Sequence, residues 1–493
     1  MGEDVSSGPT TVPAPVPEPP PLRATLRRVV IAWMFGSAWM YLASGAAFTR
    51  YAKLLNVSHF GFGLLAAVPF IGAMVQLPTS MFLERYGHRK ALFLWTNTIH
   101  RSLWLVIAAI PWILPPGVQW PVLIVLMLIS ALLANVATPA WMTWMADLVP
   151  QRIRGRYFSR RVQIGQAVGL ALSMVSGLAL DWPGSADPER LTAVISAMFA
   201  VAGACGVIDI LIFSRVPDPH PQAHHRPRVG LVELVRRPMA NPNFRRFLGY
   251  SATMTLATGY MAQFLWLYLF DVAGMNNTWA NSLMISVPIC VTMLTYPFWG
   301  RMVDRFGTKP VLLLAGILVV NGGTFWIFVT PTSWLPGYVF VLIATLAWPG
   351  MDLAAFNILL RMTGTGPRGL AGTTAVAINS LGVAIAGALS GLLGGSVAAW
   401  LGNDWRGSLF GWPLTYHGVL FLISAGLRAT SLLWIVPIEE GRRMATRDAL
   451  LYMANAAYSN LQLATGFSLR MLSSVVRLTW RLPRRGGPPL GRS

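Results

Sequence analysis

The sequence alternates between long apolar stretches and short polar segments that hold most of the charged residues. A membrane-spanning helix needs about 20 consecutive apolar residues, and twelve stretches meet this requirement. Several contain proline or glycine, which helices packed inside a membrane tolerate. No ten-residue alternation of apolar and polar positions recurs, which disfavours a β-barrel. The pattern predicts an all-α polytopic membrane protein whose spans occupy 28–48, 59–83, 91–113, 120–146, 162–180, 191–214, 247–270, 278–300, 310–330, 338–360, 370–400 and 412–436.

Composition agrees with this pattern and excludes a water-soluble enzyme. Hydrophobic residues make up 54% of the 493 residues and charged residues 11%, whereas soluble domains carry about 25% charged residues. A soluble chain could not bury so much apolar surface in the cores of domains of ordinary size. The net charge of +20 resides in short clusters between the spans, which disfavours a nucleic-acid-binding protein.

The distribution of lysine and arginine predicts how the chain is oriented in the membrane. If the N-terminus is cytoplasmic, 32 of the 38 lysine and arginine residues lie in cytoplasmic segments. The segments on the opposite side hold only Arg50, Lys53, Arg190 and Arg406. Because positive residues concentrate on the cytoplasmic side of membrane proteins, we expect a multi-pass protein of the inner or plasma membrane with both termini in the cytoplasm.

Landmarks in the first half of the chain recur in the second half at a nearly constant offset. The run Glu84–Gly87 matches Asp304–Gly307 at an offset of 220, and Val216 and Pro217 match a second Val-Pro pair 220 residues later. A duplicated unit of six helices leaves such a pattern, and two copies in the same orientation form parallel repeats. We therefore expect two six-helix bundles related by a pseudo-twofold axis, the architecture of a transporter.

This division separates the chain into five segments. The proline-rich start holds almost no large apolar residue, so we expect it to be disordered. The tail combines arginines with polar residues, as expected of an amphipathic helix on the inner membrane surface, with a thirteenth span as the alternative. The predicted segments are a cytoplasmic tail at 1–25, an N-terminal bundle at 26–215, a cytoplasmic linker at 216–246, a C-terminal bundle at 247–437 and a basic tail at 438–493.

Two short loops at matching positions of the repeats share one composition. LERYGHRK (Leu83–Lys90) and GRMVDRFGTK (Gly300–Lys309) each place an acid at the end of a span, followed by arginine, glycine and basic residues. Glycine permits the tight reversal that a short loop between antiparallel helices requires. The acid is placed to interact with arginines or with the N-terminus of an opposing helix. The candidate gating residues are Glu84, Arg85, Gly87, Arg89, Lys90, Gly300, Asp304, Arg305, Gly307 and Lys309.

Twelve spans in two halves, joined by a polar linker and carrying the loop pattern G-x-x-x-D-R-x-G-x-[RK], resemble the major facilitator superfamily over residues 26–437. The second loop matches this pattern fully, whereas the first has serine for the leading glycine and glutamate for the aspartate. The resemblance implies that the loop acids close an inner gate by contacting the opposite half. Glu84 would then lie near Leu370, and Asp304 near Arg160.

A second arginine-rich segment joins the fourth and fifth predicted spans. DLVPQRIRGRYFSRR (Asp147–Arg161) resembles an acid–Pro–Arg-Gly pattern of the same superfamily, and GTGPRGLAG (Gly364–Gly372) is its weaker copy. Its arginines are candidates for latching the loop acids of the opposite half, with anchoring to lipid headgroups as the alternative. The candidate latch residues are Asp147, Arg154, Gly155, Arg156, Arg160, Arg161 and Arg368.

The resemblance also implies that the first, fourth, seventh and tenth spans line a central cavity. Aromatic residues with few hydrogen-bonding groups suit a small amphipathic organic molecule, although some of these side chains would serve helix packing alone. Asp352 is the only acid on the four spans, so we expect it to couple a proton or to recognise a cationic group. The candidate cavity residues are Trp33, Ser37, Tyr41, Asn135, Thr138, Thr253, Tyr260, Gln263, Trp348, Asp352 and Asn357.

Ionisable residues inside spans are costly and therefore mark candidate functional positions. His100 and Arg101 lie within the third span, and Arg101 is expected to meet a structural partner or an anionic substrate. Asp209 and Arg428 lie at matching positions of the two repeats. We expect both of them to extend toward the inner headgroups.

These features predict a secondary active transporter that moves a small organic solute across the cell membrane by alternating access, with proton coupling as an option. Its partners would be the small-molecule substrate, the proton and membrane lipids, and we expect a monomer without cofactor, metal ion or nucleic acid. A membrane-embedded enzyme needs clustered acids and histidines, or residues at the spacing of metal ligands. An ATP-driven pump needs a glycine- and lysine-containing motif that binds phosphate. The sequence shows none of these. The alternative is a transporter-like scaffold or receptor that moves no substrate.

Overall fold

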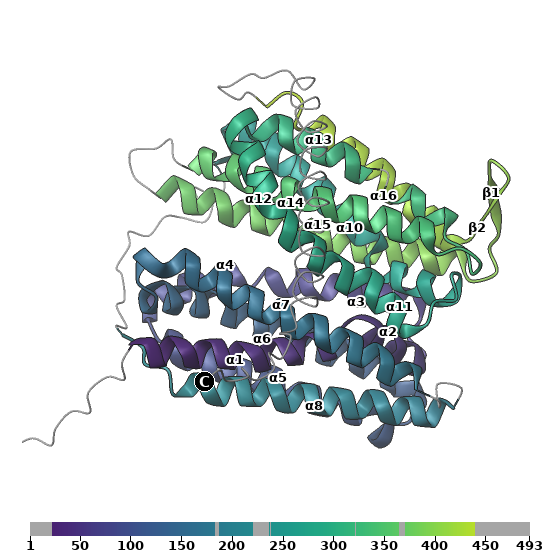
Figure 1. The fold of residues 1–493 in the computed structure, drawn as a ribbon, viewed down its shortest axis with the longest axis horizontal. Helices are drawn as coiled ribbons and strands as arrows, with labels where there is room; N and C mark the ends of the chain where they lie inside the picture. Colours follow the sequence, from purple (N-terminus) through teal and green to yellow (C-terminus); the bar gives the residue numbers. More distant parts are fainter. Residues whose placement is uncertain are drawn as a thin grey trace, which may run out of the picture.

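Long helices dominate the computed structural model, which describes residues 22–182, 187–219, 236, 238–320, 322–363 and 370–438. The first half of the chain forms one bundle and the second half another (Figure 1). The first bundle contains α1 (Leu22–Leu42), α2 (Gly45–Leu54), α3 (His59–Ala73), α4 (Gln76–Tyr86), α5 (Arg89–Ile113), α6 (Pro116–Leu148), α7 (Gln151–Asp181) and α8 (Pro188–Ser214). The second contains α10 (Pro242–Asp271), α11 (Asn277–Asn281), a π-helical turn (Ser282–Ser286), α12 (Val287–Phe306), α13 (Thr308–Val320), a 3₁₀ turn (Thr324–Phe328), α14 (Leu335–Thr363), α15 (Leu370–Leu401) and α16 (Tyr416–Leu433).

Each of the twelve predicted spans corresponds to one helix or to two or three successive helical segments. The first span is divided into α1 and α2, which bend by 44° at a break before Gly45. Within the described residues, nine helices are long and apolar enough to cross a membrane, or ten if α1 and α2 form one span. The helices α5 and α10 fall outside that set despite their 25 and 30 residues. Both carry polar residues in their interior, such as Asn97, His100 and Arg101 on α5 and Gln263 on α10, which lower their hydropathy.

Helix ends follow the local sequence. The Ser58 side chain accepts a hydrogen bond from the Gly61 backbone N–H at 3.1 Å and so caps α3. Asn276 caps α11 in the same way, through the Trp279 N–H at 2.9 Å. These short polar side chains satisfy N–H groups that have no partner within the helix. A hairpin of β1 (Gly407–Leu409) and β2 (Trp412–Leu414), which the sequence did not predict, connects α15 to α16.

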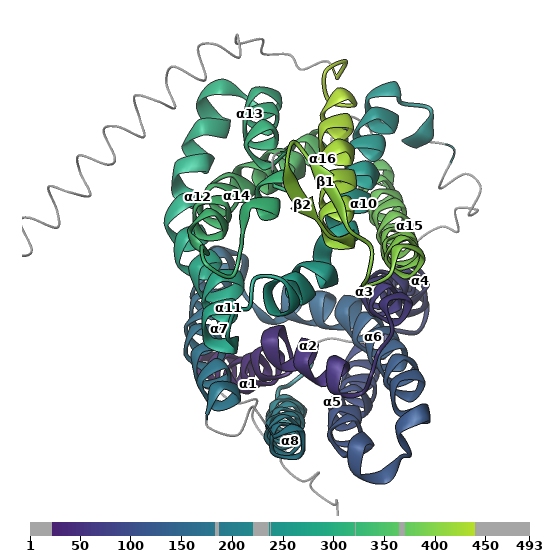
Figure 2. The ribbon, with the colours of Figure 1, turned by 90° about the vertical axis from the view of Figure 1, so that its right-hand side faces the viewer.

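The buried apolar side chains form three clusters, and their arrangement shows how the bundles meet. The largest cluster contains residues of both halves, such as Leu55 and Phe199 from the first and Phe264 and Phe421 from the second. Each of the other two clusters lies within one half. The halves therefore share a core at one end of the molecule and have separate cores at the other end. We call the shared end the α2–α11 end, because α2 and α11 lie there between the two halves (Figures 1 and 2).

The predicted segment boundaries remain predictions, because much of the chain they concern lies outside the described residues. The tail at 438–493 is described only at residue 438, and the linker at 216–246 only at 216–219, 236 and 238–246. Helix α1 begins at Leu22, within the segment predicted as the N-terminal tail.

Candidate functional site

The carboxylate of Asp181 joins the two bundles at the α2–α11 end. Asp181, at the end of α7, accepts hydrogen bonds from the backbone N–H and side-chain Nδ2 of Asn277 at 2.9 and 2.8 Å. Its other oxygen accepts from the backbone N–H and hydroxyl of Thr278 at 2.8 and 2.6 Å. Both donors lie in the first turn of α11, where free N–H groups favour an anion. Asp181 therefore holds the end of α7 against the second bundle.

Two basic residues of α2 reinforce this contact. Arg50 donates from Nε to the Asn277 side-chain oxygen at 2.9 Å, and its guanidinium lies 4.1 Å from the centre of the Phe270 ring. Lys53 forms an ion pair with Asp271. Arg50 and Lys53, which the charge pattern assigned to a segment on the outer side, thus lie in α2 and have partners in the second bundle that the pattern alone did not identify.

A third group of polar contacts lies deeper between α7 and the second bundle. The Asn281 side-chain oxygen accepts from the Ala46 N–H at 3.0 Å, and its Nδ2 donates to the Ser173 carbonyl at 2.9 Å. The Ser173 and Ser286 hydroxyls are 3.1 Å apart. All four residues are buried, so opening this end would expose several paired polar groups to water.

The helices α3 and α15 cross with almost no side chain between them. A Cβ atom placed on Gly391 would lie 2.5 Å from the Gly63 carbonyl oxygen and 2.6 Å from the Ala67 nitrogen. A Cβ on Gly395 would lie 2.8 Å from the Gly63 Cα. Small residues allow helix backbones to approach this closely inside a membrane. The glycine spacing of the eleventh predicted span therefore serves packing between the bundles.

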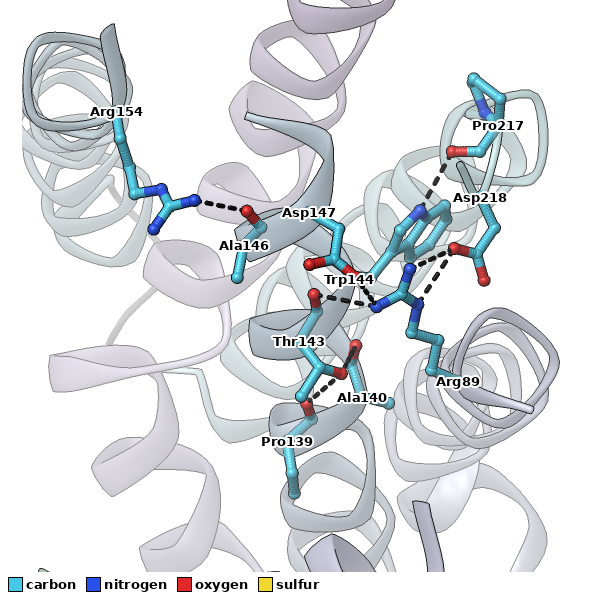
Figure 3. A network of polar contacts seen from close by, with 10 residues as sticks. All are labelled: Arg89, Pro139, Ala140, Thr143, Trp144, Ala146, Asp147, Arg154, Pro217 and Asp218. Atoms are coloured by element: carbon cyan, nitrogen blue, oxygen red, sulfur yellow. Dashed lines mark hydrogen bonds and ion pairs between the residues drawn. The ribbon is translucent and has the colours of Figure 1, made fainter. Parts of the chain in front are cut away.

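The opposite end of the first bundle is held by one arginine, Arg89 (Figure 3). Its Nε and Nη2 donate to Asp218 at 3.0 and 2.7 Å, and its Nη1 donates to the Thr143 carbonyl at 3.1 Å and also contacts Asp147. These partners follow α8 and end α6, so Arg89 ties three segments of the same bundle together. We call this end the Arg89 end.

The two loops predicted to form the gate have the backbone conformation that the glycine argument requires. Gly87 has φ 75° and Gly307 has φ 94°, a region that glycine enters without steric cost. No described atom lies within 4 Å of a Cβ placed on Gly300. The Lys309 ammonium donates to the Val436 and Ile438 carbonyls at 2.6 and 2.8 Å, within its own bundle.

The predicted contacts of the loop acids with the opposite half stay predictions. Glu84 and Asp304 are exposed, and Leu370 lies at the first residue of α15, whose side chain is outside the description. The guanidinium of Arg85 lies 5.2 Å from the centre of the Tyr86 ring, and that of Arg305 lies 5.6 Å from the centre of the Phe306 ring. In each pair the aromatic residue directly follows the arginine in the sequence.

The predicted latch residues separate into different environments. Asp147 contacts Arg89, and Arg154 donates to the Ala146 and Val149 carbonyls of its own bundle. Arg161 is buried between two tryptophan rings. The exposed members of the set are Gly155, Arg156 and Arg160, and Arg368 lies outside the described residues.

His100 and Arg101, the two ionisable residues of the third predicted span, are buried. The His100 ring nitrogen Nδ1 lies 2.8 Å from the Ser130 hydroxyl. Arg101 forms an ion pair with Asp209 at 3.4 Å, and its guanidinium lies 3.6 Å from the centre of the Trp39 ring. The structural partner expected for Arg101 is therefore Asp209.

The expectation that Asp209 and Arg428 extend toward headgroups is wrong. Asp209 is 4% exposed and Arg428 is 6% exposed. Arg428 donates to the Val319 carbonyl at 3.1 Å and contacts the Met261 sulfur at 3.0 Å. Both side chains turn into their bundles, where Asp209 pairs with Arg101 and Arg428 contacts the Val319 carbonyl and the Met261 sulfur.

The predicted cavity residues differ in exposure, and their role stays a prediction. Thr138 and Asp352 are exposed, whereas Ser37 and Tyr260 are buried. The half-buried members are Trp33, Tyr41, Asn135, Thr253, Gln263, Trp348 and Asn357.

Sequence reasoning missed the residues that join the bundles. Asp181, Asn277, Thr278 and Asn281 are ordinary polar residues near predicted span ends. Their pairing depends on how two distant segments approach each other, which no local pattern shows. The sequence offered one signal for this contact, namely that Asp181 directly follows the fifth predicted span, on the side of the membrane predicted to hold few basic residues.

Comparisons with known proteins agree with this architecture. The family model described as Major Facilitator Superfamily matches residues 29–385. A mutant form of the nucleoside transporter NupG is similar in structure, with a TM-score of 0.65, 12% identity and coverage of 85% of this chain and 100% of that chain. A D-xylose–proton symporter has a TM-score of 0.63, 14% identity and coverage of 84% and 98%.

A bacterial homologue of the human lysosomal transporter Spinster, solved in an inward-facing, unoccupied conformation, has a TM-score of 0.54 and 17% identity. The match covers 85% of this chain and 95% of that chain. No curated protein matches the sequence. At these identities the solved structures establish the fold and leave the substrate open.

Proposed function

The chain belongs to the major facilitator superfamily, and from this premise we propose that it moves a small organic solute across the cell membrane by alternating access. As a multi-pass member of this family it is a secondary active transporter. A member of the superfamily transports through a site between two bundles that rock against each other. The proposal therefore requires that reversible contacts close the interface between the bundles at one end. It also requires that the bundles can move apart at the other end.

The unequal distribution of contacts between the bundles is the observation that carries this proposal. At the α2–α11 end the halves share an apolar core, the Asp181 hydrogen bonds and the glycine crossing. Toward the Arg89 end each half has its own core. No described atom lies within 4 Å of a Cβ placed on Gly300, which lies on α12 in the motif whose family counterpart closes the inner gate. This is the arrangement expected of a transporter closed at one end.

The charge pattern supports an orientation for this closed end. The Arg89 end carries the arginine-rich loops, and positive residues favour the cytoplasmic side. We therefore assign the α2–α11 end to the external side of the cell membrane and the termini to the cytoplasm. The conformation is then closed outside and faces inward.

Asp352 supports a proton or a cationic group as a partner of the transport cycle. It lies on α14, and its side chain is exposed although the helix crosses the predicted membrane core. An acid at such a depth is costly unless it meets water, a proton or a cation. We infer that Asp352 takes part in coupling or in substrate recognition by a monomeric transporter.

The experiment uses a cysteine that becomes accessible only when the external end opens. The two native cysteines, Cys205 and Cys290, are replaced by serine, and Ser286→Cys is introduced. Ser286 is 7% exposed between the bundles. A membrane-impermeant maleimide added to whole cells should label it slowly, because the population with this end open is small.

Asp304→Asn distinguishes a transporter from a static scaffold. If Asp304 closes the inner gate, its removal favours the inward-facing state and lowers the labelling rate of Ser286→Cys. Asp404→Asn, an exposed acid in the loop after α15, is the matched control and should leave the rate unchanged. Absence of labelling in every variant, or equal rates with and without Asp304, would indicate a scaffold or receptor.

A further inference from the structure

An arginine of the first bundle is held between two indole rings. Arg161 lies on α7 and is 8% exposed. Its guanidinium carbon is 3.9 Å from the centre of the Trp33 ring and 4.6 Å from that of the Trp141 ring. Stacking on aromatic faces satisfies the flat sides of a guanidinium and leaves the N–H groups at its edge available.

The edge of this guanidinium has no hydrogen-bond acceptor among the described residues. Its Nε is buried and unpaired. Neighbouring arginines behave differently, because Arg89 and Arg154 direct their nitrogens to carboxylates or carbonyls of the same bundle. A buried guanidinium without an acceptor is costly, so its persistence at this position calls for an occupant that the protein itself does not supply.

Charge balance in the surrounding cluster points to the same conclusion. Arg101 and Arg161 are both buried, and Asp209 is the one buried carboxylate among the described residues near them. Asp209 is paired with Arg101, and one of its oxygens is buried without a partner. The cluster therefore holds one more positive than negative charge in a part of the molecule where water screens poorly.

The position of Arg161 is compatible with access from the Arg89 end. Its tryptophan neighbours come from α1 and α6, two of the helices expected to line the cavity, and both rings are half-buried. Thr138, one helical turn from Trp141 on α6, is exposed. The surface of α6 one turn from the contact between Trp141 and Arg161 is therefore open to a ligand.

We propose that Arg161 binds the carboxylate or phosphate group of a soluble organic anion, so that the transported solute is anionic. This deepens the proposed function and rests on it. The Trp33 and Trp141 rings hold the guanidinium plane, and its edge donates charge-assisted hydrogen bonds to the anion. Arg161 is thus a substrate-binding residue and not a part of the inner latch.

The test compares charged compounds with neutral compounds of nearly the same shape. Full-length protein in a neutral detergent is heated with one compound at a time from three pairs, each made of an anion and a neutral counterpart. The pairs are benzoate and benzamide, phenyl phosphate and phenol, and acetate and acetamide. Ligands that bind the folded state raise the unfolding temperature. We expect at least one anion to raise it in a concentration-dependent manner, while its neutral counterpart does not.

Variants of the arginine assign the effect to this site. Arg161→Gln should weaken the apparent affinity for the active anion about tenfold or more, since a charge-assisted contact is lost. Arg161→Lys keeps the charge without the flat guanidinium and should weaken it less. Arg190→Gln, an exposed arginine in the first turn of α8, is the matched control and should bind as the unmodified protein does. Trp141→Phe, which keeps Arg161, gives an independent variant if Arg161→Gln fails to fold, and should also weaken binding.

Several outcomes would overturn the proposal. Neutral compounds could stabilise the protein as strongly as anions do, or the effect of the anion could survive in Arg161→Gln and Trp141→Phe. Vesicles of phosphatidylglycerol could also stabilise the protein when no soluble anion does so. A complete absence of stabilisation would also overturn it. Labelling of Ser286→Cys reports on alternating access separately, so a failed anion site is distinguishable from a failed transport function.

Discussion

At the scale of single residues, one acid and one lysine at the same interface should differ greatly in their energetic effect. Asp181 accepts four hydrogen bonds, two on each oxygen, whereas Lys53 makes an ion pair whose partners are 33% and 38% exposed. Exposed pairs contribute about 0–1 kcal/mol, and hydrogen bonds to a charged group about 1.5–3 kcal/mol each. The α2–α11 end therefore depends mainly on Asp181.

Asp181→Ala should open this end. Loss of even one charge-assisted hydrogen bond shifts the equilibrium about tenfold or more, so the labelling rate of Ser286→Cys should rise by at least that factor. Lys53→Ala should raise it by less than about fivefold. Equal effects of the two substitutions would mean that the carboxylate does not control the closure.

Arg89 should matter for stability more than for the state of the interface. Its guanidinium binds Asp218, Asp147 and the Thr143 carbonyl within one bundle. Arg89→Gln should lower the free energy of unfolding by about 2 kcal/mol, seen as a lower thermal unfolding temperature. Arg85→Gln, the exposed arginine of the same loop, serves as the control and should leave that temperature nearly unchanged.

At the scale of elements, the crossing of α3 and α15 depends on glycine. Gly391→Ala would place a methyl group 2.5 Å from the Gly63 carbonyl oxygen, so the helices must separate at the α2–α11 end. Ser286→Cys labelling should therefore increase. Gly426→Ala on α16, where nothing lies within 4 Å of the added carbon, is the matched control. A similar change in both variants would show that close packing at the crossing is not what closes this end.

The elements also show what the sequence could and could not reveal. Apolar length located the helices, because the membrane requires every span to satisfy its own backbone hydrogen bonds. The repeated loops, with Gly87 and Gly307 at positive φ, were visible because their geometry is local. The environment of Asp209 was not visible, since it depends on Arg101, which is 108 residues away. The contacts of Asp181 and the tryptophan pair around Arg161 likewise arise from the relative placement of whole helices.

At the scale of the molecule, two bundles share a core at one end and hold separate cores at the other. The hydrogen bonds between the described residues of the two halves gather at the shared end, around Asp181, Asn277 and Asn281. Polar contacts of this kind exchange readily for contacts with water, so they suit an interface that opens and closes. Intra-bundle ties such as that of Arg89 keep each half rigid while it moves.

Distances across both ends of the molecule test this account most directly. Spin labels at Asn56 and Asp404 report on the α2–α11 end, and labels at Tyr86 and Val376 report on the Arg89 end; all four positions are exposed. Introducing Asp181→Ala should lengthen the first distance and shorten the second in the same sample. If both distances stay fixed, or if both lengthen together, the two bundles do not rock about a common site and the transport mechanism proposed for this chain is wrong.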